Sequence, residues 1–491
     1  MRHFLFACLL ALGGPAFAAD PKPPEPAKAE AGFAPLPADR TVTQSAVIAG
    51  TNISYQVTVG TLPLLDAKGK KTGELVYTAY VVPNRGPARP VTFAFNGGPG
   101  AASAFLNYGA IGPKRVQFGA QGDAPSDSAI ARDNPNSWLD FTDLVFIDPI
   151  GTGYSRSLLD EAETKKTFFT ADTDIQYLSR IVADWLTKNG RMTSPKYLVG
   201  ESYGGYRVPR LAYHLQSQLG VGLNGIVMVS PALSPRTIFG DTIALSPMNY
   251  VATLPSMAAG QLERRGRLSG PAALAEVESY ARGEFITDLL RGRADPQAID
   301  RLTTRVSGFT GMDPKLVRQL EGRIDVRTYL REIHRDTKSI GSIYDSNVTA
   351  FDPYPEAMQQ QSNDPILDAG MAPVTGAAID LMTRTVGWKV DARYNLLSYA
   401  VNAAWDWDRN DDAIADLRKA ISVDPKMAVV IAHGMDDLSC PYFASRLVID
   451  QLPTFGRPDR VQLALYAGGH MFYSRADSGA AFRKTALGIY R

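Results

Sequence analysis

Hydrophobic and polar residues repeat with different periods along the chain, and their order predicts an α/β fold. Between residues 45 and 82, apolar and polar positions alternate, which predicts antiparallel strands with a turn at Lys68-Gly69. Short, mostly apolar runs follow, and helical stretches separate them, as is typical of strands in a mainly parallel sheet. These runs are residues 91–95, 144–147, 197–199, 225–229, 427–432 and 461–465.

One helix is clearly marked between residues 172 and 190. Asp172 and Asp174 favour its N-terminal end, and Gly190 favours its stop. Apolar residues recur inside it at spacings of three and four, so this stripe is interpreted as the side that packs on the core. The stripe consists of Ile175, Leu178, Val182 and Trp185.

A long segment in the middle of the chain lacks strand runs of this kind. Residues 274–336 predict several short helices with faces rich in Arg and Glu, and residues 340–395, with their Pro and Gly, are interpreted as irregular. We therefore expect a largely helical insertion at residues 236–395, which would form a lid. It would divide an α/β core into a first part, residues 41–235, and a second part, residues 396–491.

The N-terminal residues have the pattern of a secretory signal peptide. Arg2 gives a positive start, residues 4–12 are apolar, and residues 16–18 read Ala-Phe-Ala, a cleavage site of the A-x-A type. A lipoprotein signal ending at Cys8 is the alternative. Residues 1–18 are thus expected to be removed, and the Pro- and Ala-rich residues 19–40 to form a flexible tether. The sequence predicts export to the periplasm or the cell exterior.

The composition argues against several classes of partner and against stabilisation by disulfide bonds. The chain has 491 residues, 45% hydrophobic, and a formal net charge of +1, so nothing predicts a nucleic-acid or anionic-membrane partner. No later apolar run approaches the roughly 18 residues of a membrane helix. With Cys8 removed, Cys440 is the remaining cysteine, so no internal disulfide is expected and a large core must stabilise the protein.

The pattern Gly-x-Ser-x-Gly around Ser202 is the first candidate for chemistry. It follows the predicted strand at residues 197–199, and a helix is expected from Tyr203 onward. In such a strand–turn–helix, small residues at Gly200 and Gly204 let the strand and the helix pass closely, and the serine hydroxyl is exposed. An ordinary glycine-rich turn is the alternative interpretation of this pattern alone.

A serine nucleophile needs a base, and the chain offers five histidines. His470 follows the strand run at residues 461–465 and two glycines, so it is the predicted base. The other four have plainer interpretations. His3 lies in the signal, His214 on or under a helix, His334 on a solvated face of the insertion, and His433 in a turn.

The acid and the oxyanion-binding groups are expected in loops that follow other strands. Asp437 is the predicted acid, because it lies past the turn after the run at residues 427–432, and Asp436 is the alternative. The backbone N–H groups of Tyr203 and Gly98 are the predicted oxyanion donors. No His/Cys cluster has the spacing of a metal site, so neither a metal nor another cofactor is predicted.

These motifs together resemble the serine carboxypeptidase family. The similar blocks span roughly residues 80–235 and 395–491, and the insertion matches in position only. The blocks are NGGPG at residues 96–100, NPNSW at 134–138, DPIGTGYS at 148–155, GESYGG at 200–205, HGMDDLSCP at 433–441 and GGHMF at 468–472.

The resemblance implies an α/β-hydrolase fold and a triad of Ser202, Asp437 and His470. It implies that Asn96, Gly97 and Glu201 bind the terminal carboxylate of a peptide substrate, with Glu201 protonated in the working complex. The resemblance supports Asp437 over Asp436, because Cys440, a partly buried thiol in this interpretation, follows three residues later, as in the family.

The expected activity is therefore release of C-terminal residues from peptides, favoured at acidic pH. Two departures from the family pattern stand out: Ala94 replaces a tryptophan that helps to bind the carboxylate, and Ala101 replaces a disulfide cysteine. Ala94 keeps open a second interpretation, an esterase or acyltransferase on the same scaffold. A binding protein without catalysis is the third.

Overall fold

The computed structural model describes residues 34–83, 88–119, 122, 124–233, 246–357, 364–407, 413–456 and 459–490. The chain divides into two units, Met1–Pro35 and Leu36–Arg491, and all the described helices and strands belong to the second. The expected signal peptide, Cys8 and the first part of the expected tether lie outside the described residues.

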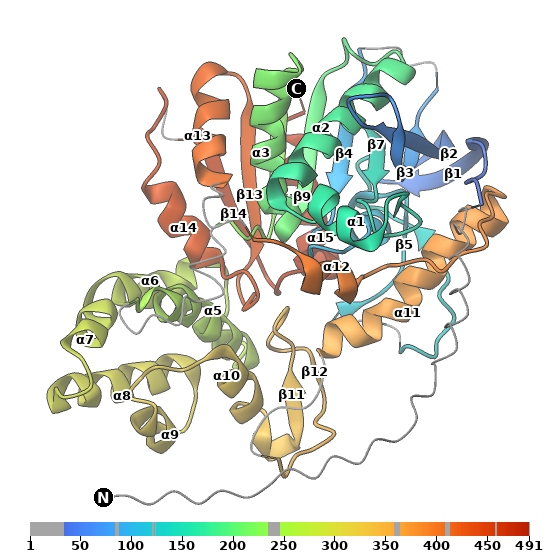
Figure 1. The fold of residues 1–491 in the computed structure, drawn as a ribbon. Coiled ribbons are helices and arrows are strands. Elements are labelled where there is room, and N and C mark those ends of the chain that lie inside the picture. Colours follow the sequence, from blue (N-terminus) through green and yellow to red (C-terminus); the bar gives the residue numbers. More distant parts are fainter. Residues whose placement is uncertain are drawn as a thin grey trace, which may run out of the picture. The chain divides into compact units, whose positions relative to one another are not determined.

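Ten of the described strands form one mixed sheet with the order β1-β2-β3-β7-β4-β9-β10-β13-β14, and β8 pairs with β3 (Figure 1). β1, β2, β3 and β7 pair antiparallel, whereas β7, β4, β9, β10, β13 and β14 run parallel. The predicted combination of N-terminal antiparallel strands and a parallel sheet is confirmed. The strands are β1 (Arg40–Ile48), β2 (Thr51–Leu65), β3 (Lys71–Val81), β4 (Val91–Phe95), β7 (Asp143–Ile147), β8 (Arg156–Ser157), β9 (Lys196–Glu201), β10 (Gly225–Val229), β13 (Ala428–Gly434) and β14 (Val461–Tyr466).

Both faces of the parallel strands are buried, which explains why their sequences are continuously apolar. Side chains alternate between the faces of a strand. In β4, Phe93 and Phe95 therefore belong to one core cluster and Ala94 to another. The first cluster includes residues of α2 (Ala171–Lys188), α3 (Tyr203–Gln218) and α13 (Ala413–Val423). The second includes residues of the π-helix η1 (Leu106–Ile111), α11 (Pro365–Asp380) and α15 (Ala476–Leu487).

Shorter elements complete the described part of this core. They are the two-stranded pair β5 (Lys114–Arg115) and β6 (Arg132–Asp133), together with α1 (Glu161–Phe168), α12 (Tyr399–Ala404), α14 (Tyr442–Asp450) and the 3-10 helix η7 (Phe472–Ser474). None of the described helices is both long and apolar enough to cross a membrane.

The middle of the chain is mostly helical and has its own apolar cluster (Figure 1). The cluster also takes in Met435, Leu438, Tyr442 and Phe443 of the second core segment, so this middle part packs beside the end of β13. Its elements are α5 (Met248–Arg264), η3 (Pro271–Leu274), α6 (Ala275–Tyr280), η4 (Ala281–Phe285), α7 (Ile286–Arg291), α8 (Pro296–Thr310), α9 (Pro314–Gln319), α10 (Val326–Glu332), η5 (Arg335–Thr337), β11 (Ser339–Gly341) and β12 (Thr349–Phe351).

The interpretation of residues 340–395 as irregular was wrong. This segment contains the strand β12, the 16-residue helix α11 and the π-helix η6 (Leu381–Thr385), and β11 runs into its start. The prolines of this segment led to the wrong interpretation, because proline usually interrupts a helix. Pro365 occupies the first turn of α11, where a missing N–H is harmless, and Asp364 caps the helix through the backbone N–H groups of Ile366 and Leu367.

A buried ion pair joins α2, α3 and the loop after β4. Arg207 Nε donates to Asp174 Oδ2 at 2.6 Å, and Arg207 Nη1 donates to the carbonyl oxygen of Asn96 at 2.7 Å. Both charged side chains are almost fully buried. If one partner is removed, the other charge stays in a low-dielectric site without compensation.

Replacing this guanidinium should therefore strongly destabilise the fold. We expect Arg207→Met to lower the free energy of unfolding by about 3–5 kcal/mol, measured by urea denaturation. The control is Arg180→Met on the exposed side of α2, where the pair with Asp184 spans 3.8 Å and both side chains are nearly half exposed. The control should change stability by less than about 1 kcal/mol. Equal losses in the two variants would contradict a structural role for the buried pair.

Candidate active site

The carboxyl ends of five neighbouring parallel strands meet at one edge of the sheet. The loops that leave this edge are the usual site of ligand binding in α/β sheets. Asn96 follows β4, Ser202 follows β9, Ser230 follows β10, Asp437 follows β13 and His470 follows β14. The predicted site residues, far apart in the sequence, thus lie on loops at a common edge.

Ser202 lies at a strained turn between β9 and α3. Its backbone angles are φ 60° and ψ −121°, outside the regions that residues with a side chain normally occupy. The backbone N–H of Ser202 donates to the carbonyl oxygen of Val229 at 3.0 Å, which ties the turn to the end of β10. Strain of this kind at a half-buried serine is typical of a nucleophile turn.

Glycines are required on both sides of this turn because the backbones nearly touch. A Cβ on Gly200 would lie 2.0 Å from the carbonyl oxygen of Gly204, and a Cβ on Gly204 would lie 2.4 Å from that of Phe95. A Cβ on Gly97 would lie 2.5 Å from the backbone nitrogen of Tyr203. The loop after β4 therefore passes directly against the start of α3.

This close passage leaves two backbone donors without partners near Ser202. Neither the N–H of Gly98 nor the N–H of Tyr203 donates a hydrogen bond to another residue in the described ranges. Gly98 is exposed and has φ 101°. Two free N–H groups beside a serine hydroxyl could bind a negatively charged oxygen.

His470 and Asp437 form a buried hydrogen-bonded pair. His470 Nδ1 lies 2.8 Å from Asp437 Oδ2. The other carboxylate oxygen, Asp437 Oδ1, accepts the backbone N–H groups of Ser439 at 2.8 Å and Cys440 at 2.9 Å. Burial disfavours a charged imidazole, but the Asp437 carboxylate outweighs burial and raises the pKa of His470 well above its usual value.

The hydroxyl of Ser202 forms no hydrogen bond with His470 or with another residue that the structure describes. Hydrogen bonds between nucleophile and base are often longer in free hydrolases and shorten when substrate is bound. The backbone of His470 is nevertheless held at the end of β10, the strand that pairs with β9, because its carbonyl oxygen accepts the hydroxyl of Ser230 at 2.8 Å.

Glu201 is a fully buried carboxyl group next to the nucleophile. Asn96 Nδ2 donates to Glu201 Oε2 at 2.5 Å, and the Tyr473 hydroxyl donates to Glu201 Oε1 at 2.8 Å. Burial raises the pKa of Glu201 to about 7, against the opposing effects of His470 and these two donors. Small changes near neutral pH therefore switch the charge of this carboxyl group.

The sequence did not single out Tyr473 or Arg207 as functional residues. Tyr473 is three residues after His470 in the same loop, and this shared loop is the signal that could have indicated it. Arg207 is on the first turns of α3, five residues after Ser202, and it supports the carbonyl oxygen of Asn96. A buried arginine inside an otherwise apolar helix face is the corresponding signal.

The other described histidines have different hydrogen-bond partners or surroundings. His433 is buried and its Nε2 lies 2.8 Å from the Ser445 hydroxyl, and burial lowers its pKa to about 3. His214 is half-buried on α3. The expectation that His334 is solvated was wrong: it is half-buried, and its Nε2 lies 2.9 Å from the carbonyl oxygen of Ser346.

Two neighbours of Asp437 also differ from expectation in their surroundings. The thiol of Cys440 is 1% exposed rather than partly buried, and it interacts with the His470 ring. Asp436 points instead to Glu263 and Asp345, and the carboxylate oxygens of these three residues lie within 4.8 Å of one another. No local sequence pattern predicted this group, because its members come from three separate segments.

The first half of the chain matches a known family. Residues 62–246 match the family model described as serine carboxypeptidase. Serine carboxypeptidase-like 36 of Arabidopsis thaliana is 28% identical over 41% of this chain and 39% of its own length. Serine carboxypeptidase S10 family member 1 of Dictyostelium discoideum is 27% identical over 36% of this chain and 40% of its own length. The chain thus spans about two fifths of the length of these relatives, and the segment that matches the family model includes Ser202.

The fold extends the similarity over the rest of the chain. The crystal structure of a prohormone-processing carboxypeptidase from Saccharomyces cerevisiae superposes with a TM-score of 0.54 at 16% identity, covering 89% of this chain and 91% of that one. The order of strands and helices is that of an α/β-hydrolase fold, as predicted. Residues 62–246 thus resemble the serine carboxypeptidase family, and the described chain has the α/β-hydrolase fold.

Proposed function

We propose that the protein is a serine carboxypeptidase that releases C-terminal residues from peptides through an acyl-enzyme. Ser202 is the nucleophile and attacks the scissile carbonyl carbon. His470 accepts the hydroxyl proton and then donates it to the leaving amine, and Asp437 orients and stabilises the imidazole. Water, deprotonated by His470, attacks the acyl-enzyme in the second half of the reaction. The buried contact of 2.8 Å between His470 and Asp437 supports these roles.

The negative charge that forms on the carbonyl oxygen needs donors that are already in place. The free N–H groups of Gly98, in the loop after β4, and of Tyr203, directly after Ser202, are the proposed donors. Donors fixed by the backbone do not reorganise during the reaction, so they stabilise the transition state more than water does.

Recognition of the free C-terminus is the observation that separates a carboxypeptidase from an ordinary esterase. Glu201 and Asn96 are hydrogen-bonded to each other beside Ser202, with Gly97 between Asn96 and the oxyanion loop. When Glu201 is protonated, it can donate a hydrogen bond to a peptide carboxylate, and a neutral carboxyl group does not repel that carboxylate. The buried, raised-pKa Glu201 next to the nucleophile carries the proposal.

A panel of three substrates tests the reaction class. A dipeptide with a blocked N-terminus and a free carboxylate should be cleaved, whereas the same dipeptide amide should lose at least roughly tenfold in kcat/KM because it cannot pair with Glu201 and Asn96. Ser202→Ala should lower the rate at least about a thousandfold.

The outcome for a short ester decides between the two candidate functions. Ala94, which is fully buried in β4, provides no tryptophan at the carboxylate site, so an esterase or acyltransferase remains the second candidate. Rapid hydrolysis of the ester without any preference for the free-carboxylate peptide over its amide would contradict the carboxypeptidase proposal.

Ionisation of Glu201 should limit activity on peptides on the alkaline side of pH 7. Below pH 7 the raised pKa keeps Glu201 neutral, and above it Glu201 becomes a carboxylate that repels the substrate carboxylate. The neutral form of His470 is the active base, so its protonation limits the rate at the acid end. Because Asp437 also raises the pKa of His470, the two limits lie close together, and activity on peptides should be confined to a narrow pH range in which Glu201 is partly protonated and His470 partly neutral.

The variant Glu201→Gln distinguishes the alkaline limit, set by ionisation of Glu201, from the acid limit, set by protonation of His470. In the parent enzyme, kcat/KM for a free-carboxylate peptide should fall about tenfold per pH unit well above pH 7, since one proton is lost. In Glu201→Gln, this alkaline fall should disappear, because the amide does not ionise, while the acid fall due to His470 should stay. The dipeptide amide serves as the control substrate and should lack the alkaline fall in both enzymes. An unchanged alkaline fall in the variant would remove this role from Glu201.

We also propose that the protein is exported through its N-terminal segment, on the strength of the sequence pattern of residues 1–18. Expressed in a bacterium, the protein should reach the periplasm or medium and begin at Ala19, as measured by peptide mass spectrometry. Leu9→Arg, which interrupts the apolar run, should retain the full-length chain in the cytoplasm. A membrane-bound product that begins at Cys8 would instead indicate the lipoprotein signal.

A further inference from the structure

Three consecutive residues of the middle segment bind the loops that carry the triad acid and base. We name residues 343–345, in the turn of the β11–β12 hairpin, the strap. The carbonyl oxygen of Ile343 accepts the backbone N–H of Leu438 at 3.0 Å. The carbonyl oxygen of Tyr344 accepts the backbone N–H of His470 at 2.5 Å. The strap thus connects the loop that contains Asp437 with the loop that contains His470.

The third strap residue, Asp345, holds the histidine loop through its side chain. Asp345 Oδ2 accepts the backbone N–H of Gly469 at 3.2 Å and lies 2.6 Å from Arg475 Nη2. Gly469 directly precedes His470, and Arg475 is five residues beyond it. The carboxylate therefore holds the histidine loop on both sides of the base.

Contact between the strap and the histidine loop is close. A Cβ on Gly469 would lie 1.8 Å from the carbonyl oxygen of Tyr344, and the rings of Tyr344 and His470 meet edge to face at 5.2 Å between centroids. Any shift of the strap would therefore move His470. On the other side, the core holds the same residue through the Ser230 hydroxyl and the His470 carbonyl oxygen.

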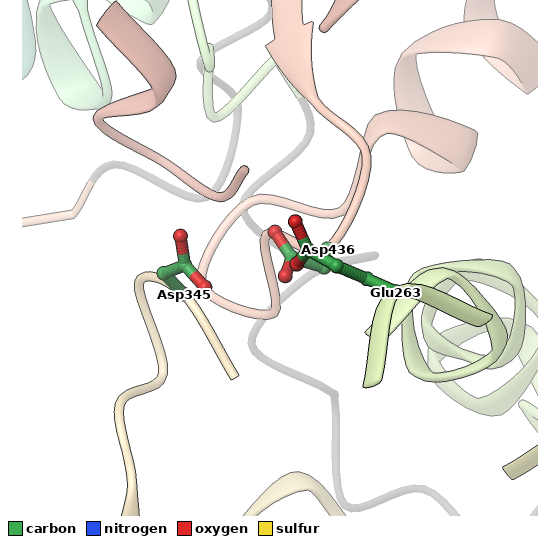
Figure 2. A group of neighbouring side chains, drawn as sticks. All are labelled: Glu263, Asp345 and Asp436. Carbon is green, nitrogen blue, oxygen red and sulfur yellow. The ribbon is translucent and has the colours of Figure 1, made fainter. Parts of the chain in front are cut away.

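Asp345 belongs to a cluster of carboxyl groups that joins three segments (Figure 2). Glu263 comes from α5, Asp345 from the strap and Asp436 from the loop after β13. Arg475 forms ion pairs with Glu263 and Asp345, so a guanidinium already opposes the charge of the cluster. Burial, followed by the charges of Asp345 and Glu263, raises the pKa of Asp436, which favours its neutral form next to the Asp345 carboxylate.

We propose that Asp345 is a positioning residue for His470, through which the middle segment sets the geometry of the triad. This inference rests on the proposed function of the Ser202–Asp437–His470 site. Asp345 fixes the Gly469 amide and Arg475, and these contacts hold the imidazole between Asp437 and the nucleophile. Asp345 contacts the histidine loop rather than the reacting atoms, so its loss should affect turnover more than substrate binding.

The chain contains a matched control for Asp345 in the same segment. Asp352 is also a buried aspartate, 8% exposed. Its carboxylate accepts the backbone N–H of Tyr354 at 2.9 Å and lies 3.5 Å from Arg331 Nη2. Both of these partners belong to the middle segment, so the loss of Asp352 removes similar local contacts without touching a catalytic loop.

The experiment compares Asp345→Ala, Asp345→Asn and Asp352→Ala in the full chain. For Asp345→Ala, we expect kcat to fall roughly 10- to 100-fold with KM within about threefold, since small misplacements of catalytic groups have effects of this size. The rate at which a fluorophosphonate labels Ser202 should fall by a similar factor. Asp345→Asn keeps an oxygen for the Gly469 amide and should recover most of the lost kcat. Asp352→Ala should keep kcat within about twofold.

Three results would overturn the proposal. They are parental kcat and labelling in Asp345→Ala, equal losses in Asp345→Ala and Asp352→Ala, or a loss confined to KM. If Asp345→Ala does not fold, Asp345→Leu decides, because leucine keeps a similar volume but accepts no hydrogen bond from the Gly469 amide. Parental kcat and labelling in a folded Asp345→Leu would overturn the proposal. Labelling needs no peptide substrate, so a parent enzyme that is labelled but cleaves no peptide would refute the proposed function without touching this inference.

Discussion

The close passage of three backbone segments at Ser202 is the constraint on which the site depends. The end of β9, the start of α3 and the loop after β4 approach so closely that a Cβ on Gly200, Gly204 or Gly97 would overlap a neighbouring backbone atom. This packing holds Ser202 at φ 60° and leaves the amides beside it unpaired. The strain is maintained because strand pairing and two core clusters surround the turn.

Burial and pairing determine which side chains around this turn are charged and how each charge is compensated. Arg207 and Asp174 neutralise each other under the loop after β4, while Glu201 is held by Asn96 and Tyr473. Burial makes the ionised form of a carboxyl group costly unless a partner compensates it. Among the described residues, Glu201 has neutral donors but forms no salt bridge, so burial raises its pKa towards neutrality and its charge depends on pH.

The middle segment contributes to the same site although it has a separate apolar cluster. Its hairpin supplies hydrogen-bond acceptors to both loops that carry the proposed triad acid and base, and α5 supplies Glu263 to the neighbouring carboxyl cluster. The middle segment can therefore also determine how the loops that carry Asp437 and His470 are held. Loops placed on a rigid sheet still need such support, because their own backbones make few regular hydrogen bonds.

The sequence by itself determined the sheet strands, the turn at Ser202 and the choice of His470 as the expected base. Alternating positions and apolar runs reflect the direction and burial of strand side chains, and glycines mark the places where two backbones pass closely. Each of these features is therefore encoded in a short stretch of sequence. The sequence also favoured Asp437 over Asp436, first because Asp437 lies past the turn and then through the family resemblance. The structure separates the two aspartates by their partners: Asp437 faces His470, and Asp436 faces Glu263 and Asp345.

Tertiary structure alone decided which distant side chains meet. Tyr473 reaches Glu201, Asp345 reaches Gly469, and Arg207 reaches Asn96, in each case across more than a hundred residues of sequence. No period or motif encodes these contacts, because they depend on how loops from different strands end at one sheet edge. The sequence did not predict helix α11 because proline usually interrupts a helix. In the structure its prolines are tolerated because of where they lie in the helix and how they pack.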